Sequence, residues 1–154
     1  MRRLTKTGVA AAGVCAMTVL SAGPSFADGV YHSSHYDLSA VGGVPLRSGF
    51  VQNIHANGPN VYAHEQYVLN GAKPKTTYQV VLVIFPGDLT CSSTPVSIPV
   101  ATIRTNAAGN GVAHHVFVPA DADGLHGTTV GGTWTVSAGG SLNYQTGCKT
   151  IVLD

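Results

Sequence analysis

Charged side chains are scarce in this sequence. Only 10% of the 154 residues are charged, and glutamate occurs once, at Glu65. Three of the eight basic residues (Arg2, Arg3 and Lys6) precede residue 28, whereas all seven acidic residues follow residue 27, so the chain after residue 27 has five minus seven, a net charge of −2. Its basic residues are scattered along the sequence: Arg47, Lys73, Lys75, Arg104 and Lys149. Nucleic-acid binding needs a concentrated positive surface, so we expect no nucleic-acid partner.

Long apolar runs are also missing. The longest, from Gly8 to Leu20, has about 13 residues, and a bilayer-spanning helix needs roughly 20. This run follows three basic residues and precedes the small residues Ser25 and Ala27, which is the pattern of a secretory signal peptide. We therefore expect export, cleavage after Ala27, and a secreted, extracellular protein with no membrane span in its mature chain.

Cysteine is rare, and its placement is informative. Cys15 belongs to the expected signal peptide (1–27), which leaves Cys91 and Cys148. An even pair in an exported protein predicts a disulfide, since the alternatives of two free thiols or a catalytic cysteine lack a supporting motif. In the chain-entropy model such a long-range bridge contributes on the order of 4 kcal/mol.

Helical periodicity is absent after the signal segment, and short runs with strand character take its place. Gly, Thr and Val dominate these runs, and turn residues such as Gly58 and Pro59 separate them. Strands are expected at 49–56, 61–69, 76–85, 96–105, 112–118, 132–138 and 148–153. The run 76–85 is apolar on both faces towards its end, which predicts a central strand, and Pro99 predicts an edge or a bulge in the next one.

This spacing is typical of an all-β fold, an immunoglobulin-like antiparallel β-sandwich of about seven strands with one disulfide. The expected organisation is a signal peptide over 1–27, an irregular N-terminal arm over 28–47 and the sandwich domain over 48–154.

Two segments resemble known families. The first, "LNGAKPKTTYQVVLV", is similar to the strand-entry pattern L-x-P-x-T-x-Y-x-V of fibronectin type III and other immunoglobulin-like sandwiches, with Pro74 and Tyr78 at the structural corner. The resemblance implies that Tyr78 points inward and that its hydroxyl bonds to upstream backbone. The second, "ATIRTNAAGNGVAHHVFVP", resembles a strand–turn–strand unit of small secreted actinobacterial sandwich proteins, among them the neocarzinostatin-type apoproteins. That family carries an enediyne chromophore and uses two short-range disulfides.

The stretch "YAHEQYVLNGA" opens like the zinc-binding motif HExxH. Val68 occupies the place of the second histidine, and a two-residue period puts His64 and Glu65 on opposite faces of a strand, so the zinc-protease reading fails. Glu65 alternates with mostly apolar neighbours. It is therefore either a partly buried acid that needs a partner or, as we favour, a sheet-edge glutamate bonded to backbone or tyrosine.

Seven histidines offer a different metal site. His55 and His64 flank the turn around Gly58 and Pro59, so a hairpin could bring them close together, and one of His114 and His115 could join them. Three imidazoles suit Cu(II) or Zn(II). No fixed spacing supports the set, and ordinary surface histidines are the favoured alternative.

No catalytic motif appears in the sequence. A G-x-S-x-G elbow, a complete calcium loop and a P-loop are all missing, and we expect Trp134 in the core rather than on a glycan platform. The favoured function is thus a secreted, non-enzymatic binding or surface-associated module without a cofactor, whose partner is an extracellular protein, a glycan or a small molecule. A small Cu- or Zn-binding protein using histidines is the alternative, and an apolar small-molecule carrier is the third hypothesis.

Overall fold

The computed structural model describes residues 32–55, 63–122, 124–125 and 127–153, so the expected signal peptide (1–27) lies outside the described residues. The described chain forms ten strands and one short 3₁₀ helix: β1 (His32–Asp37), β2 (Ser39–Ala40), β3 (Ser48–His55), β4 (Ala63–Asn70), β5 (Thr77–Phe85), β6 (Val96–Arg104), β7 (Gly111–Phe117), η1 (Pro119–Ala122), β8 (Thr128–Ala138), β9 (Ser141–Gln145) and β10 (Lys149–Leu153). In this part of the chain no helix is long and apolar enough to cross a membrane.

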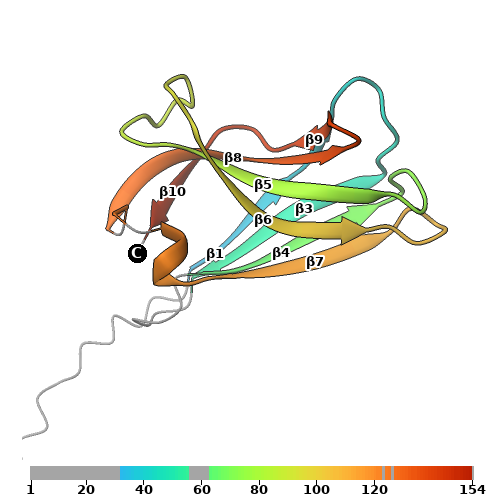
Figure 1. Ribbon diagram of the computed structural model, residues 1–154, viewed down its shortest axis with the longest axis horizontal. Coiled ribbons are helices and arrows are strands. Elements are labelled where there is room, and N and C mark those ends of the chain that lie inside the picture. Colours follow the sequence, from blue (N-terminus) through green and yellow to red (C-terminus); the bar gives the residue numbers. More distant parts are fainter. Residues whose placement is uncertain (1–31, 56–62, 123, 126, 154) are drawn as a thin grey trace, which may run out of the picture.

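The strands form two antiparallel sheets packed face to face (Figure 1). One sheet has the order β1-β3-β4-β7. The other has the order β2-β9-β8-β5-β6, and β10 pairs with β8 as well. The predicted all-β sandwich is therefore confirmed, although it has ten strands where about seven were expected.

The core lies between the two sheets and is rich in large rings. Trp134, Tyr67, Tyr78 and Tyr144 are each at most 1% exposed. β4 shows how the sequence produces this core, because its residues alternate between buried and more exposed along the whole strand. The prediction that Trp134 belongs to the core is confirmed.

The N-terminal arm predicted over 28–47 is wrong for residues 32–40. β1 pairs in antiparallel register with β3, and β2 pairs with β9, so this segment contributes an edge strand to each sheet. Tyr36 anchors β1, since its ring stacks on Trp134 with the ring centroids 5.0 Å apart. The segment has few apolar side chains at alternate positions, which is why its sequence does not reveal the strand.

The predictions for the two long apolar strands are confirmed. β5 lies between β6 and β8, and β6 is an edge strand of its sheet. The register of the β5–β6 pair shifts by one residue beside Pro99, as expected where a proline cannot donate to the ladder.

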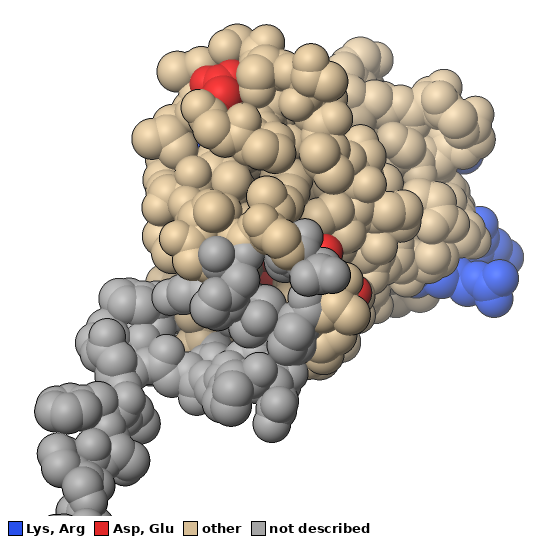
Figure 2. Space-filling model, turned by 60° about the vertical axis from the view of Figure 1, so that its left-hand side comes forward, with Lys and Arg blue, Asp and Glu red and all other residues tan. Residues whose placement is uncertain are grey.

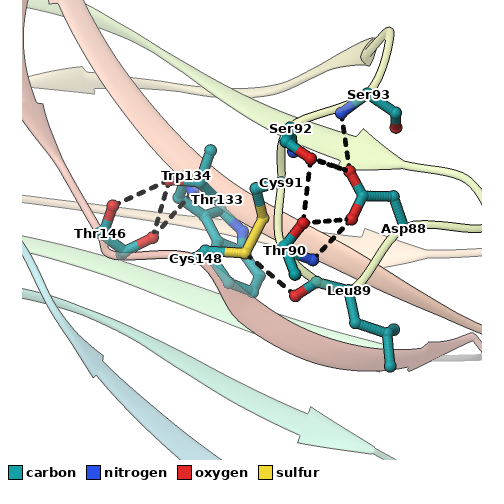
Figure 3. The surroundings of a disulfide bond; sticks show 10 residues. All are labelled: Asp88, Leu89, Thr90, Cys91, Ser92, Ser93, Thr133, Trp134, Thr146 and Cys148. Carbon is teal, nitrogen blue, oxygen red and sulfur yellow. Dashed lines mark hydrogen bonds between the residues drawn. A yellow bond between two sulfur atoms is a disulfide. The ribbon is translucent and has the colours of Figure 1, made fainter.

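The predicted disulfide joins Cys91 to Cys148, which are 57 residues apart in sequence (Figure 3). Asp88 holds the loop that carries Cys91, because its carboxylate accepts hydrogen bonds from the backbone N–H groups of Thr90, Ser92 and Ser93, each at 2.7 Å. The hydrogen bond from the Thr90 hydroxyl, followed by the backbone bonds from Thr90, Ser92 and Ser93, holds the pKa of Asp88 well below its usual 3.8.

Candidate binding site

The four histidines proposed as metal ligands lie on two different faces of one sheet. His64 is opposite Ile54 in β3, and His114 is opposite Gln66 in β4, both on the outer face. His55 and His115 lie on the inner face, which also carries the buried core residues. The β3–β4 hairpin is confirmed, but His55 and His64 point to opposite sides of it.

No group of three or more His, Cys, Asp and Glu side chains that could hold a metal ion occurs among the described residues. His115 contacts Phe117 edge-on with ring centroids 4.5 Å apart, and its Nε2 lies 3.7 Å from Oδ2 of Asp121. The structure therefore does not assemble the proposed three-imidazole set among the described residues.

Glu65 lies inside the sandwich and ties the two sheets together. It is 2% exposed, and its carboxyl group accepts hydrogen bonds from Asn53 Nδ2 at 2.6 Å, from the Tyr67 hydroxyl, and from Trp134 Nε1 at 2.8 Å. Asn53 and Tyr67 belong to the same sheet as Glu65, whereas Trp134 comes from β8 in the other. The expected tyrosine partner is confirmed, but the sheet-edge position is wrong, because β4 is an interior strand.

No Lys or Arg neutralises this carboxyl group within the described residues, and burial raises the pKa of Glu65 above its usual 4.5 against the effect of its three hydrogen bonds. Burial and the neighbouring Glu65 also raise the pKa of Tyr67, so its phenol remains a donor. We interpret Glu65 as a structural link between the two sheets, because it is almost fully buried and its three hydrogen-bond partners are buried side chains from both sheets.

The β2–β3 loop, the β4–β5 turn and the β8–β9 hairpin lie at the other end of the sandwich (Figure 1). Residues of these three segments line a cavity. Its volume is about 480 Å³, within the range of roughly 300–1,000 Å³ that ligand pockets occupy. We call it the Tyr144 pocket. It is lined by Val44, Pro45, Lys73, Thr76, Thr77, Tyr78, Ala138, Gly139, Ser141, Asn143 and Tyr144.

The floor of the Tyr144 pocket is a pair of hydrogen-bonded phenols. The hydroxyls of Tyr78 and Tyr144 lie 3.2 Å apart, and the Tyr144 hydroxyl donates to the carbonyl oxygen of Pro45 at 2.9 Å. Burial, followed by the Tyr78 hydroxyl, raises the pKa of Tyr144, so this phenol keeps its proton and can donate to Pro45. The predicted bond from Tyr78 to upstream backbone is wrong for the described residues: Tyr144 donates to the upstream carbonyl of Pro45, and the Tyr78 hydroxyl pairs with the Tyr144 hydroxyl.

The rim of the pocket carries polar groups on a firmly held turn. The buried hydroxyl of Thr105 donates to the carbonyl of Lys73 at 2.7 Å and accepts from the N–H of Thr76 at 2.9 Å. Lys75 N–H donates to the carbonyl of Asn106 at 3.1 Å. The β4–β5 turn is thereby fixed to the β6–β7 turn, so the side chains of Lys73 and Thr76 project from a rigid support.

Sequence patterns alone identify this end of the molecule only in part. Tyr78 of the expected corner lines the pocket, and Pro74 directly follows the lining residue Lys73 and accepts a hydrogen bond on its carbonyl oxygen from Thr76 Oγ1 at 2.9 Å. Ser141 and Asn143 were missed, because β9 follows a Gly-Gly hairpin and has no long apolar run to mark it as a strand.

The chain was compared with protein-family models, with curated proteins and with solved structures, and none of them matches it.

Proposed function

We propose that this protein is a secreted, non-enzymatic binding module that holds a glycan chain end in the Tyr144 pocket. The observation that carries the proposal is the pocket itself, a cavity of about 480 Å³ whose lining mixes hydroxyl and amide groups with small apolar surfaces. The cysteine pair and the signal-peptide pattern of the sequence support an extracellular setting.

The lining matches the surface of a sugar. Thr77 and Ser141 present exposed hydroxyls, and the amide of Asn143 is partly exposed, so these groups can exchange hydrogen bonds with sugar hydroxyls. Val44 and Pro45 supply apolar surface against which the C–H face of a sugar ring can pack. A site of this kind, mainly apolar in area with a few placed polar groups, is typical of small-ligand recognition.

A binding role suits this lining better than a catalytic one. The pocket residues include no Asp, Glu, His or Cys, so the groups available there are hydrogen-bonding groups and one lysine rather than an acid–base pair. The firmly bonded β4–β5 turn also favours binding, since a preorganised site loses little conformational entropy when the ligand enters.

Nuclear magnetic resonance titration of the chain from residue 28 onward tests the proposal. Neutral and anionic tetrasaccharides are added in turn, and saturable shift changes are expected at Thr77, Ser141 and Asn143. Ser141→Tyr, which fills the mouth of the pocket, should abolish them. Ser97→Tyr, a matched substitution at another exposed serine, should not. Binding that survives Ser141→Tyr, or the absence of binding to every tetrasaccharide, would overturn the proposal.

A further inference from the structure

The fold gathers most of the basic residues at one end of the sandwich. Arg47 directly precedes β3, Lys73 and Lys75 lie in the β4–β5 turn, and Arg104 ends β6. These segments lie at the same end of the sandwich in Figure 1. Figure 2 brings the opposite end forward, and the blue Lys and Arg atoms lie at its right-hand edge. Four of the five basic residues outside the signal segment therefore share one end, although the sequence scatters them.

Each of these four basic residues either lines the Tyr144 pocket or is close to a lining residue, along the chain or across a strand pair. Lys73 lines the pocket, and Lys75 directly precedes the lining residues Thr76 and Thr77. Arg104 is the cross-strand partner of Thr77. Arg47 follows the lining residue Pro45 by two positions.

Protein carboxylates do not neutralise this basic end. Within the described chain, the ion pairs within 4.0 Å are those of His35 with Asp37 and of His115 with Asp121. All four cations are solvent-exposed, and none of them has a carboxylate partner among the described residues. Four like charges around one cavity create a positive potential that attracts an anion and raises its local concentration.

We propose that the ligand of the Tyr144 pocket is an anionic saccharide, one that carries a carboxylate or a sulfate. This inference rests on the function proposed above and specifies its ligand. Lys73 contacts the anionic group from inside the pocket, and Arg47, Lys75 and Arg104 steer it from the rim. The site favours a saccharide over a nucleic acid, because Lys73 lines a partly open pocket and the four cations, among the described residues, do not form a stripe with exposed aromatic rings between them.

Two matched probes separate charge from shape. Tetragalacturonate carries carboxylates, and its methyl ester keeps the same sugar backbone without the charge. Isothermal titration of the chain from residue 28 onward should show about tenfold tighter binding of the acid than of the ester at low salt, the scale of one charge-assisted hydrogen bond. The preference should shrink when the ionic strength rises tenfold, because salt screens exposed charges. A sulfated tetrasaccharide in a third arm tells whether carboxylate or sulfate is preferred.

Two lysine substitutions provide the internal control. Lys73→Met keeps most of the side-chain stem but removes the charge, and it should weaken acid binding about tenfold more than it weakens ester binding. Lys149→Met is the matched control, because it removes the charge of the fifth basic residue, whose Nζ lies 5.8 Å from the ring centroid of Tyr36. It should leave the affinities for the acid and for the ester unchanged.

The outcomes distinguish the two proposals. If the acid and the ester bind with equal affinity and Lys73→Met has no effect, the proposal of an anionic ligand is wrong, whereas the proposal of a saccharide-binding pocket still stands. If neither probe nor the sulfated tetrasaccharide binds, or if Ser141→Tyr leaves their binding intact, the proposed function itself fails. Competition by a short oligothymidylate at equal concentration would also overturn the inference, because it would point to a nucleic acid.

Discussion

Replacing Glu65 with glutamine tests whether the buried carboxyl group makes the stability of the protein depend on pH. No Lys or Arg among the described residues neutralises this group. Glutamine has nearly the same shape, and its carbonyl oxygen can accept from Tyr67 and Trp134 as Oε2 of Glu65 does. Its amide N–H₂ faces Asn53, whose Oδ1 is buried and has no hydrogen-bond partner among the described residues. If the side-chain amide of Asn53 flips, its Oδ1 can accept a hydrogen bond from the new glutamine amide, so we expect Glu65→Gln to fold.

The raised pKa of Glu65 determines the sign of the pH effect. The folded protein holds the proton of Glu65 more tightly than the unfolded chain, where the pKa is close to 4.5. The bound proton stabilises the folded protein fully at pH values below the pKa of the unfolded chain. This stabilisation is lost as the pH rises through the higher pKa that Glu65 has in the folded protein. Over this interval the free energy of unfolding should fall by up to about 1.4 kcal/mol per pH unit, the linkage for one proton. Glu65→Gln has no proton to lose there.

Urea denaturation of both proteins from about pH 4 to about pH 9 measures the effect as a difference, so the titration of other groups cancels. The wild-type protein should lose stability relative to Glu65→Gln as the pH rises. Parallel profiles would refute the reasoning, because Glu65 would then have the same pKa folded and unfolded. Glu65→Ala is the companion variant. It leaves three buried donors unpaired, at about 1 kcal/mol or more each, and should lose about 3 kcal/mol or more at every pH.

Three further predictions concern the two ends of the molecule. Replacing Cys91 and Cys148 with serine should lower the free energy of unfolding by about 4 kcal/mol in urea titrations, since the bridge closes a loop 57 residues long; an unchanged midpoint would contradict this. Gly109→Ala should lower the melting temperature and disorder the Tyr144 pocket, because φ there is 77° and a Cβ would collide with the carbonyl oxygen of Ala72. Lys75→Asn should raise stability by up to about 1 kcal/mol, because φ is 49°, and should weaken acid-saccharide binding in calorimetry.

The fold could be predicted to the extent that its strands are apolar at alternate positions. β5 buries Tyr78, Val80, Leu82 and Ile84 at alternate positions, which agrees with its central place in the sheet. β6 buries Val100 and Ile103 and exposes most of its other residues, which agrees with the edge position that Pro99 predicts. β1 is built differently. It is attached mainly through backbone pairing to β3 and one stacked ring, Tyr36, and a single aromatic residue in a polar segment is no periodic signal.

The candidate site was less predictable because its parts are distant in sequence. Lys73 and Arg104 become neighbours only when the β4–β5 turn docks on the β6–β7 turn, and Asn143 joins them through a hairpin from the end of the chain. Thr105, whose buried hydroxyl joins these two turns, lies within the segment that resembles a strand–turn–strand unit, but the resemblance assigns it no role. The charge and the cavity of the site are properties of the folded arrangement.

Backbone conformation gives a further reason to regard the basic end as functional. Among the described residues, Lys75 and Cys91 are the non-glycine residues with positive φ, at 49° and 58°. The disulfide accounts for Cys91, since its partner dictates where the sulfur must lie. No ion pair with a described residue accounts for Lys75, and glycine or asparagine would occupy this conformation at lower free energy. The backbone conformation of Lys75 and the repulsion between the four unneutralised cations both destabilise the free protein. The binding of an anion would offset these two unfavourable contributions.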